Sequence, residues 1–227
     1  MSANRPISVF DVIGPVMVGP SSSHTAGAVR LGLIGRAALG EAPVQAQLSL
    51  HGSFARTGRG HGTHLALVAG LLGLSPADER IRHSLRLAEE AGLHVTFDTI
   101  DLGEEAHPNS VLIHIQGPTQ SLSLGGASIG GGLVEVTQLQ GYRVHFSGEL
   151  DTLILIADDQ PGTVNTISGW LAGHQINIAT LRVKRNERGG QAIMILETDQ
   201  PLPIPLTQGL ESLPWVHWAR TIPRIKE

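Results

Sequence analysis

The sequence predicts an α+β protein built from two parts, residues 1–148 and residues 149–227. Three observations lead to this prediction. The chain has 227 residues, which is enough for two domains of ordinary size. Nine of its eleven histidines precede residue 149, so the two parts differ in composition. After Gly148, short apolar runs alternate regularly with turn signals, whereas the preceding part has Gly-rich stretches and a less regular pattern.

The first part has a mixed helix and strand pattern that predicts an α/β domain with a largely antiparallel sheet. The predicted helices cover residues 22–39, 62–72 and 77–91. The predicted strands cover residues 45–51, 94–101, 111–116, 120–124, 133–138 and 142–146. We interpret the glycine-rich residues 125–132 as a flexible connection between strands, and His114 as a hydrogen-bonded core residue.

The second part has the order βαββαβ, which is typical of a ferredoxin-like unit with two helices on one face of an antiparallel sheet. Strands are predicted at residues 152–157, 176–183, 191–197 and 216–222. Helices are predicted at residues 163–172 and 207–213. Pro161 is placed to open the first of these helices, and Gly173 to end it.

The composition excludes several classes of protein. Apolar residues make up 41% of the chain and aromatic residues only 4%, so the core consists mainly of aliphatic side chains. Charged residues are few, at 16%, which excludes a charged disordered chain and a coiled coil. The net charge of −4 offers no basic surplus for nucleic acid.

The absence of cysteine and of long apolar segments limits the chemistry and the location. Without a thiol, this chain alone cannot hold an iron–sulfur cluster, a cysteine-based zinc site or a cysteine nucleophile. The beginning of the chain has no apolar signal core, and the longest apolar stretch is half the length of a membrane span. We therefore expect a cytoplasmic protein without a membrane partner.

A run of polar side chains, Ser21, Ser22, Ser23, His24 and Thr25, stands directly before the first predicted helix. Because backbone N–H groups point outward at the start of a helix, this run favours a bound carboxylate or phosphate. A purely structural alternative is that Ser22 or Ser23 caps the helix. A cap requires one hydroxyl, which leaves the remaining polar groups of the run unexplained.

A second polar segment, residues 57–64, contains three glycines that permit close approach of the backbone to a ligand. We interpret His61 as an acid–base group or a substrate contact, because histidine titrates near neutrality. The alternative is a glycine-bent loop with a solvent-facing His64. Two histidines without an adjacent carboxylate make a weak zinc pattern.

In the second part, Pro161 and Gly162 lead into a helix, and Asn177 and Ile178 enter the next strand. Loop N–H groups at a helix start can hold the carboxylate of an amino acid, so these four residues are candidates for an effector-binding rim. The alternative is a purely structural turn.

Two stretches of the chain resemble a known enzyme family, and each of the two parts resembles a known domain. Residues 10–27, with the sequence FDVIGPVMVGPSSSHTAG, resemble the opening of the iron–sulfur-dependent L-serine dehydratases, or L-serine ammonia-lyases. Residues 51–63, with the sequence HGSFARTGRGHGT, are similar to the second motif of that family. The second part resembles an ACT domain, and the first part resembles the allosteric substrate-binding domain of some phosphoglycerate dehydrogenases.

The resemblance implies that this chain is the beta subunit of the two-subunit type, active only with an alpha subunit. That subunit would carry a [4Fe–4S] cluster on its cysteines, and the pair would convert L-serine to pyruvate and ammonia. It implies catalytic roles for His24 and His61 and substrate contacts from Ser21, Ser22, Ser23 and Thr25, with no metal ligand in this chain. Which histidine is the base stays open. ACT-like units often pair, so a dimer of heterodimers is expected.

Two other functions stay open at this point. The chain could be a non-catalytic regulatory protein that senses an amino acid through its ACT-like unit. It could also be a metal-dependent hydrolase that uses the histidines of the first part, although no complete ligand set is visible.

Overall fold

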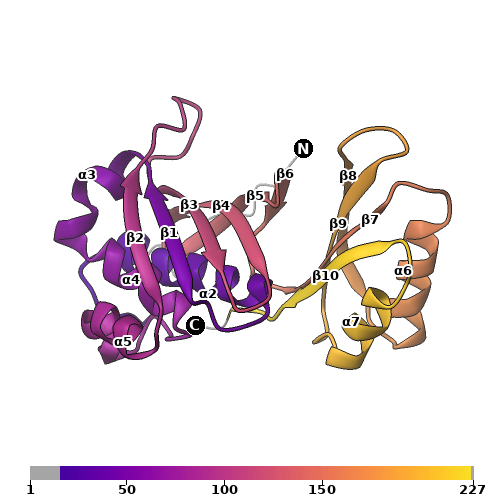
Figure 1. Cartoon of the computed structure of the whole chain (residues 1–227), viewed down its shortest axis with the longest axis horizontal. Helices are drawn as coiled ribbons and strands as arrows, with labels where there is room; N and C mark the ends of the chain where they lie inside the picture. The colour runs from indigo at the N-terminus through magenta and orange to yellow at the C-terminus, as the bar shows by residue number, and fades with distance from the viewer. Residues whose placement is uncertain (1–15, 226–227) are drawn as a thin grey trace.

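The computed structural model describes residues 16–225, in which two β-sheets lie side by side and each carries helices on one face (Figure 1). The first sheet has six strands in the order β2-β1-β3-β4-β5-β6, and only the β1–β2 pair is parallel. The second has four antiparallel strands in the order β10-β7-β9-β8. The predicted α+β fold is confirmed in both parts.

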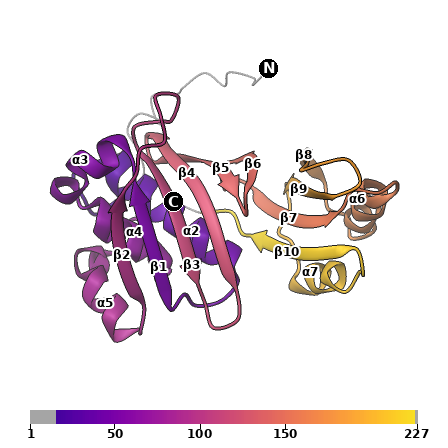
Figure 2. The same ribbon diagram turned by 45° about the horizontal axis from the view of Figure 1, so that its top comes forward.

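The first sheet is built from residues 45–146 and is covered by helices on one face (Figure 2). Its strands are β1 (Gln45–Leu50), β2 (His94–Thr99), β3 (Ser110–Gln116), β4 (Ser121–Gly130), β5 (Leu133–Leu139) and β6 (Tyr142–Phe146). The helices of this part are η1 (Ser22–Gly27), α2 (Ala28–Leu39), α3 (Gly52–His61), α4 (Thr63–Leu71), η2 (Glu79–His83) and α5 (Ser84–Glu90).

Helices α2 and α4 cross at two glycines. A Cβ atom on Gly70 would lie 2.1 Å from the carbonyl oxygen of Val29, and one on Gly32 would lie 2.4 Å from that of Leu67. Because only glycine permits this approach, the two backbones touch directly. The close crossing holds α2, and the η1 turn that precedes it, in one position against the sheet.

The second sheet has the predicted βαββαβ order. Its elements are β7 (Asp151–Asp158), α6 (Thr163–Gly173), β8 (Ile178–Arg185), β9 (Gln191–Thr198), α7 (Ile204–Glu211) and β10 (Val216–Ile222). Side chains alternate between its two faces. Leu155 and Met194 pack toward α6 and α7, whereas Ile156 and Ile193 belong to a cluster that continues into the first part.

The two parts share this apolar cluster. It includes Ile34 of α2 together with Ile154, Ile195 and Ile222 of the second sheet. Helix α2 also reaches β10, and at its C-cap a Cβ atom on Gly40 would lie 2.7 Å from Nε of Arg220. The link between the sheets, residues 147–150, contains the boundary at residue 148 that we propose between the two domains.

Three local predictions for the first part are wrong. Residues 125–130 belong to strand β4, because Gly126 lies against α2: a Cβ atom there would be 2.8 Å from Cδ2 of Leu31. The predicted helix over 77–91 is divided into η2 and α5 and begins at Glu79, where the side chain of Asp78 accepts a hydrogen bond from the backbone of Arg80. His114 is exposed on β3.

Candidate functional site

The polar run before α2 folds into a one-turn π-helix, η1, whose N-cap is Ser21. The hydroxyl of Ser21 accepts a hydrogen bond from the backbone N–H of His24, at 3.3 Å. The structural alternative, a cap at Ser22 or Ser23, is therefore wrong by one or two positions. Single π-turns are frequent at functional sites. Capping by Ser21 leaves the next two serines free for other contacts.

Ser22 and Ser23 are half-buried at the start of η1, and within residues 16–225 their hydroxyls make no hydrogen bond. The first N–H groups of a helix also lack intrahelical acceptors. Thr25 is buried at 2% exposure, and a Cβ atom on Gly19 would lie 2.2 Å from its Oγ1. The structure thus presents Ser22 and Ser23 for an anion, while Thr25 packs against the preceding loop.

Residues 52–61, expected to end in a glycine-rich loop, form helix α3 instead. The carbonyl of Pro108 accepts hydrogen bonds from the backbone N–H groups of Ser53, at 2.7 Å, and of Phe54, at 3.3 Å. The side chain of Phe54 is fully buried. Because residues four apart lie on one helix face, α3 brings Ser53, Thr57 and His61 into one row.

The Ser53 and Thr57 side chains of this row contact His24. Nε2 of His24 lies 3.1 Å from the hydroxyl oxygen of Thr57 and 3.5 Å from that of Ser53. The Thr57 hydroxyl donates to the backbone carbonyl of Ser53, at 2.9 Å. Because the Thr57 hydroxyl proton is used in that bond, its oxygen accepts the hydrogen bond from His24, and Nε2 of His24 therefore carries a proton. Nδ1 of His24 lies 3.4 Å from the Ser21 hydroxyl oxygen.

His61 ends α3 beside His24, with the two ring centroids 4.8 Å apart and the planes inclined by 34°. Nδ1 of His61 lies 3.0 Å from the backbone carbonyl of Thr57, to which it donates. In the neutral ring this leaves Nε2 of His61 unprotonated. The side chain is exposed, whereas His24 is buried at 8% exposure. The two predicted histidines are therefore together but in different environments.

The environment of His24 favours the neutral imidazole. Burial lowers the pKa of His24 below its ordinary value, and the neighbouring imidazole of His61 lowers it further. A hydrogen bond with the backbone of Ser53 opposes both effects. Phe54 packs edge-on against the same ring, with centroids 5.2 Å apart. At neutral pH this site therefore holds an uncharged His24.

The alternative interpretation of His64 as a solvent-facing residue is wrong. His64 is half-buried in α4, with its ring 4.7 Å from that of Phe97, and its Nδ1 is buried without a hydrogen bond. Burial lowers the pKa of this group too. His64 belongs to the packing of α4 against the sheet and does not join the pair formed by His24 and His61.

Ser53 and Thr57 are functional candidates that the sequence interpretation missed. They precede His61 by eight and four residues, a spacing that would have placed all three on one face if the segment had been recognised as a helix. Because the glycines at positions 58 and 60 have low helix propensity, the segment is interpreted as a loop from sequence alone.

The four residues of the expected effector rim do not come together within one chain. Pro161 and Gly162 precede α6 at the end of the sheet where Asp158 pairs with Gln191. Asn177 and Ile178 lie at the other end, where Ile178 pairs with Thr198. Strand β7 has eight residues, so the two ends are roughly 23 Å apart.

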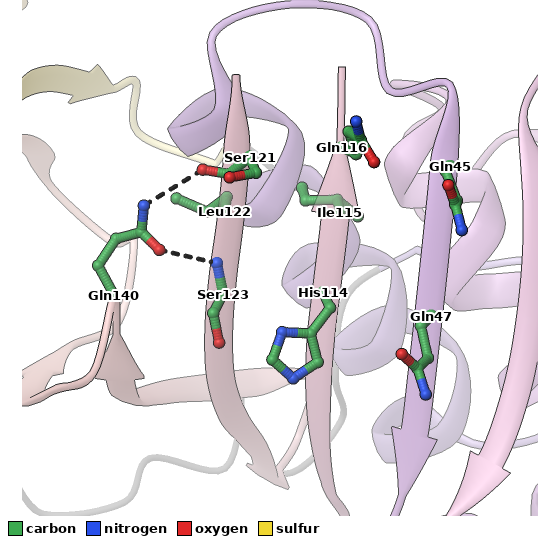
Figure 3. A pocket seen from close by; sticks show the side chains of 9 residues that line it. All are labelled: Gln45, Gln47, His114, Ile115, Gln116, Ser121, Leu122, Ser123 and Gln140. Carbon is green, nitrogen blue, oxygen red and sulfur yellow. Dashed lines mark hydrogen bonds between the residues drawn. The ribbon is translucent and has the colours of Figure 1, made fainter. Parts of the chain in front are cut away.

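A separate polar pocket lies on the uncovered face of the first sheet (Figure 3). His114 stands there between Gln47 and Ser123, which are its partners on the neighbouring strands. Gln140 is fixed by bonding the backbone N–H of Ser123 at 3.1 Å and the carbonyl of Ser121 at 3.2 Å. This pocket belongs to the opposite side of the sheet from His24.

Residues 16–225 contain neither a cluster of three potential metal ligands nor a helix that could cross a membrane. In that range no three His, Asp or Glu side chains are grouped so that they could hold a metal ion. Within the same range, no helix combines the length and the apolar character needed to cross a bilayer.

Comparison with known proteins gives consistent matches. Residues 8–138 match the family described as serine dehydratase beta chain. A probable L-serine dehydratase beta chain from Bacillus subtilis is 41% identical over 91% of this chain and 94% of its own length. The L-serine dehydratase beta chain of Peptoniphilus asaccharolyticus is also 41% identical, over 90% of this chain and 91% of its own.

A solved ACT domain, from the GTP pyrophosphokinase of Chlorobium tepidum, matches 32% of this chain and 83% of its own, with 19% identity and a TM-score of 0.27. The fold of the second part is established here by its strand order and its two helices.

Proposed function

The chain belongs to the serine dehydratase beta chain family, and from this premise we propose how it acts on L-serine together with a separate alpha subunit. The reaction is the deamination of L-serine to pyruvate and ammonia. The observation that supports a direct role for this chain is the pairing of His24 and His61 in the same segment as Ser22 and Ser23, whose hydroxyls make no hydrogen bond within residues 16–225. A site with a proton acceptor beside an anion-binding turn suits an amino acid substrate.

We assign the removal of the Cα proton to His61. Its Nδ1 donates to the carbonyl of Thr57, so in the neutral ring Nε2 is unprotonated and can accept a proton from a substrate. His24 has Nε2 bound to Thr57 and Nδ1 beside Ser21, so both of its nitrogens already have partners. This geometry favours His61 as the base and His24 as the neutral group that orients the site.

The substrate carboxylate is assigned to the start of η1. The hydroxyls of Ser22 and Ser23 and the first N–H groups of the turn are the donors that suit it. Because His24 is uncharged, it contributes no ion pair to the carboxylate. Ser21 and Thr25 support the turn through its cap and its packing.

The side chains of this chain do not fit an iron–sulfur cluster. The sequence contains no cysteine, and such clusters are held by thiolates. We therefore place the [4Fe–4S] cluster on the cysteines of the alpha subunit and assign no step at the β-hydroxyl to a residue of this chain. Binding, orientation and the Cα proton are the contributions proposed here.

The second domain is proposed to regulate the enzyme and to pair two heterodimers. Its strand β8 is an edge of the sheet, with Val183 exposed at 48%, and an edge strand is a template for pairing with another chain. The separation of Pro161 and Gly162 from Asn177 and Ile178 leaves two distinct places where an effector can bind. We also propose a cytoplasmic location.

The subunit assignment is tested by expressing this chain alone and with the cysteine-bearing alpha chain encoded in the same organism, under anaerobic conditions. Pyruvate formation from L-serine is then measured. We expect activity only from the two chains together. Activity of the isolated chain would refute the assignment, and stoichiometric serine binding by a chain that never forms the complex would favour a regulatory protein.

A further inference from the structure

The junction between the two sheets contains a cluster of cations that the proposed function does not use. Two adjoining cavities, of about 300 and 500 Å³, lie where β6 of the first sheet meets β8 of the second. In Figure 2 this edge of the first sheet faces the second part. Arg143 and Lys184 line both cavities, so one cation from each domain stands at their common wall.

The strand register explains why the cations face this junction. Arg182 pairs with Ile195 and Lys184 pairs with Ile193, and both isoleucines face the first part of the chain. Because side chains directly opposite each other share a face of the sheet, Arg182 and Lys184 also point toward β6. Arg143 approaches from β6 itself.

Two nearby carboxylates are already paired with other cations. Glu197 binds Arg182 at 3.0 Å, and Asp159 lies 3.4 Å from Arg185. Within residues 16–225, neither Arg143 nor Lys184 has an ion pair, and no acidic side chain lines either cavity. In a protein with a net charge of −4, this leaves a local positive surplus between the domains.

The rest of the lining suits an organic ligand. Val144, Ile193 and Ile195 give the smaller cavity an apolar wall. Asn186 lines the larger one, and its side-chain oxygen already accepts hydrogen bonds from the backbone of Glu187 and Gln191. The amide nitrogen of Asn186 is therefore the part that remains to donate.

We propose that this junction binds a small organic dianion, with Arg143 and Lys184 holding its charged groups. The shared chemistry is a pair of negative charges on oxygen, supplied either by a phosphate monoester or by a dicarboxylate. Guanidinium and ammonium groups both bind such oxygens. Since the ligand contacts both sheets, its binding stabilises one arrangement of the two domains. This inference does not depend on the proposed catalytic roles.

The test uses the full chain and four probes: inorganic phosphate and succinate as dianions, and acetate and chloride as monoanions at the same ionic strength. Binding is measured by calorimetry, and the melting temperature is recorded for each. We expect saturable binding and a raised melting temperature with at least one dianion. A stronger response to phosphate identifies a phosphate monoester as the ligand class, and a stronger response to succinate identifies a dicarboxylate.

Three variants test whether the dianion binds at this junction. Arg143→Gln and Lys184→Gln should each weaken binding by about tenfold, the loss expected for one charged hydrogen bond. Arg188→Gln is the matched control, because Arg188 is exposed on the same hairpin but lines neither cavity. Dianion effects equal to those of chloride, or binding unchanged by the first two substitutions, would overturn the proposal.

Discussion

Nε2 of His24 and the hydroxyl of Thr57 lie 3.1 Å apart, and this contact joins the π-turn η1 to helix α3. The Thr57 hydroxyl donates a hydrogen bond to the backbone carbonyl of Ser53 at 2.9 Å. The Thr57 hydroxyl oxygen therefore acts as the acceptor and favours the tautomer of His24 that is protonated at Nε2. The backbone carbonyl oxygen of Thr57 lies 3.0 Å from Nδ1 of His61 and favours protonation of that nitrogen.

Thr57→Val removes the acceptor at Nε2 of His24 while keeping a branched side chain of similar size. We expect kcat of the two-chain enzyme to fall by about ten- to a hundredfold, because His24 loses its fixed tautomer and orientation. Thr57→Ser should retain most of the activity, since the hydroxyl remains. The measurement is the pH profile of pyruvate formation. Equal losses in the two variants would show that the hydroxyl has no such role.

His61→Gln should lower kcat of the complex by about a hundredfold or more, because glutamine cannot accept the Cα proton. The side chain is exposed, so the free energy of unfolding should change by less than about 0.5 kcal/mol. His83→Gln is the control, since His83 is also exposed and lies outside the site. An unchanged rate in His61→Gln would remove this residue from the mechanism.

The stability of the chain should decrease as the pH falls below about 7. The pKa values of His24 and His64 are lowered in the folded protein, mainly by burial, relative to about 6.5 in the unfolded chain. At a pH between the lowered pKa of the folded chain and the ordinary pKa of the unfolded chain, the unfolded chain binds more protons than the folded chain. Acidification through this range therefore favours unfolding, and the effect ends below the lowered pKa. Urea unfolding at several pH values measures the slope. His64→Asn should reduce it and His83→Gln should not; an equal slope in all three proteins would contradict this account.

Gly70→Ala should destabilise the first domain by about 1–3 kcal/mol or more, because the new methyl group would overlap the carbonyl of Val29. Gly35→Ala is the matched control on α2. A Cβ atom there meets its nearest neighbour at 3.6 Å, which is ordinary contact. That change should be neutral or stabilise by up to about 1 kcal/mol through helix propensity. Urea unfolding distinguishes them, and similar midpoints would contradict the close crossing.

The second domain could be predicted from sequence because its signals are local. Apolar runs on β7 and β9 are bounded by turn residues, and both strands are buried on two faces. The helix after Pro161 begins at Thr163, as the proline and glycine indicate. Strand order within the sheet then follows from the βαββαβ sequence of elements.

Helix α3 could not be predicted in the same way, because distant contacts stabilise it. Its glycines have low helix propensity, and its positions read as a loop. Two contacts override that preference: the buried side chain of Phe54 and the carbonyl of Pro108, which receives the first N–H groups of the helix. His24 and His61 were predicted as a functional pair, but the partners that set their protonation lie on this helix.

The position of α2 has a mechanical consequence. The helix has twelve residues and is about 18 Å long, with the π-turn of the serines at one end and β10 at the other. The close contact of its backbone with α4 at Gly32 and Gly70 leaves little space for α2 to move sideways against that helix. We therefore expect a displacement of β10 to shift α2 as a unit and so to move His24. A conformational change in the second domain would then alter catalysis in the first domain without a change in either sheet.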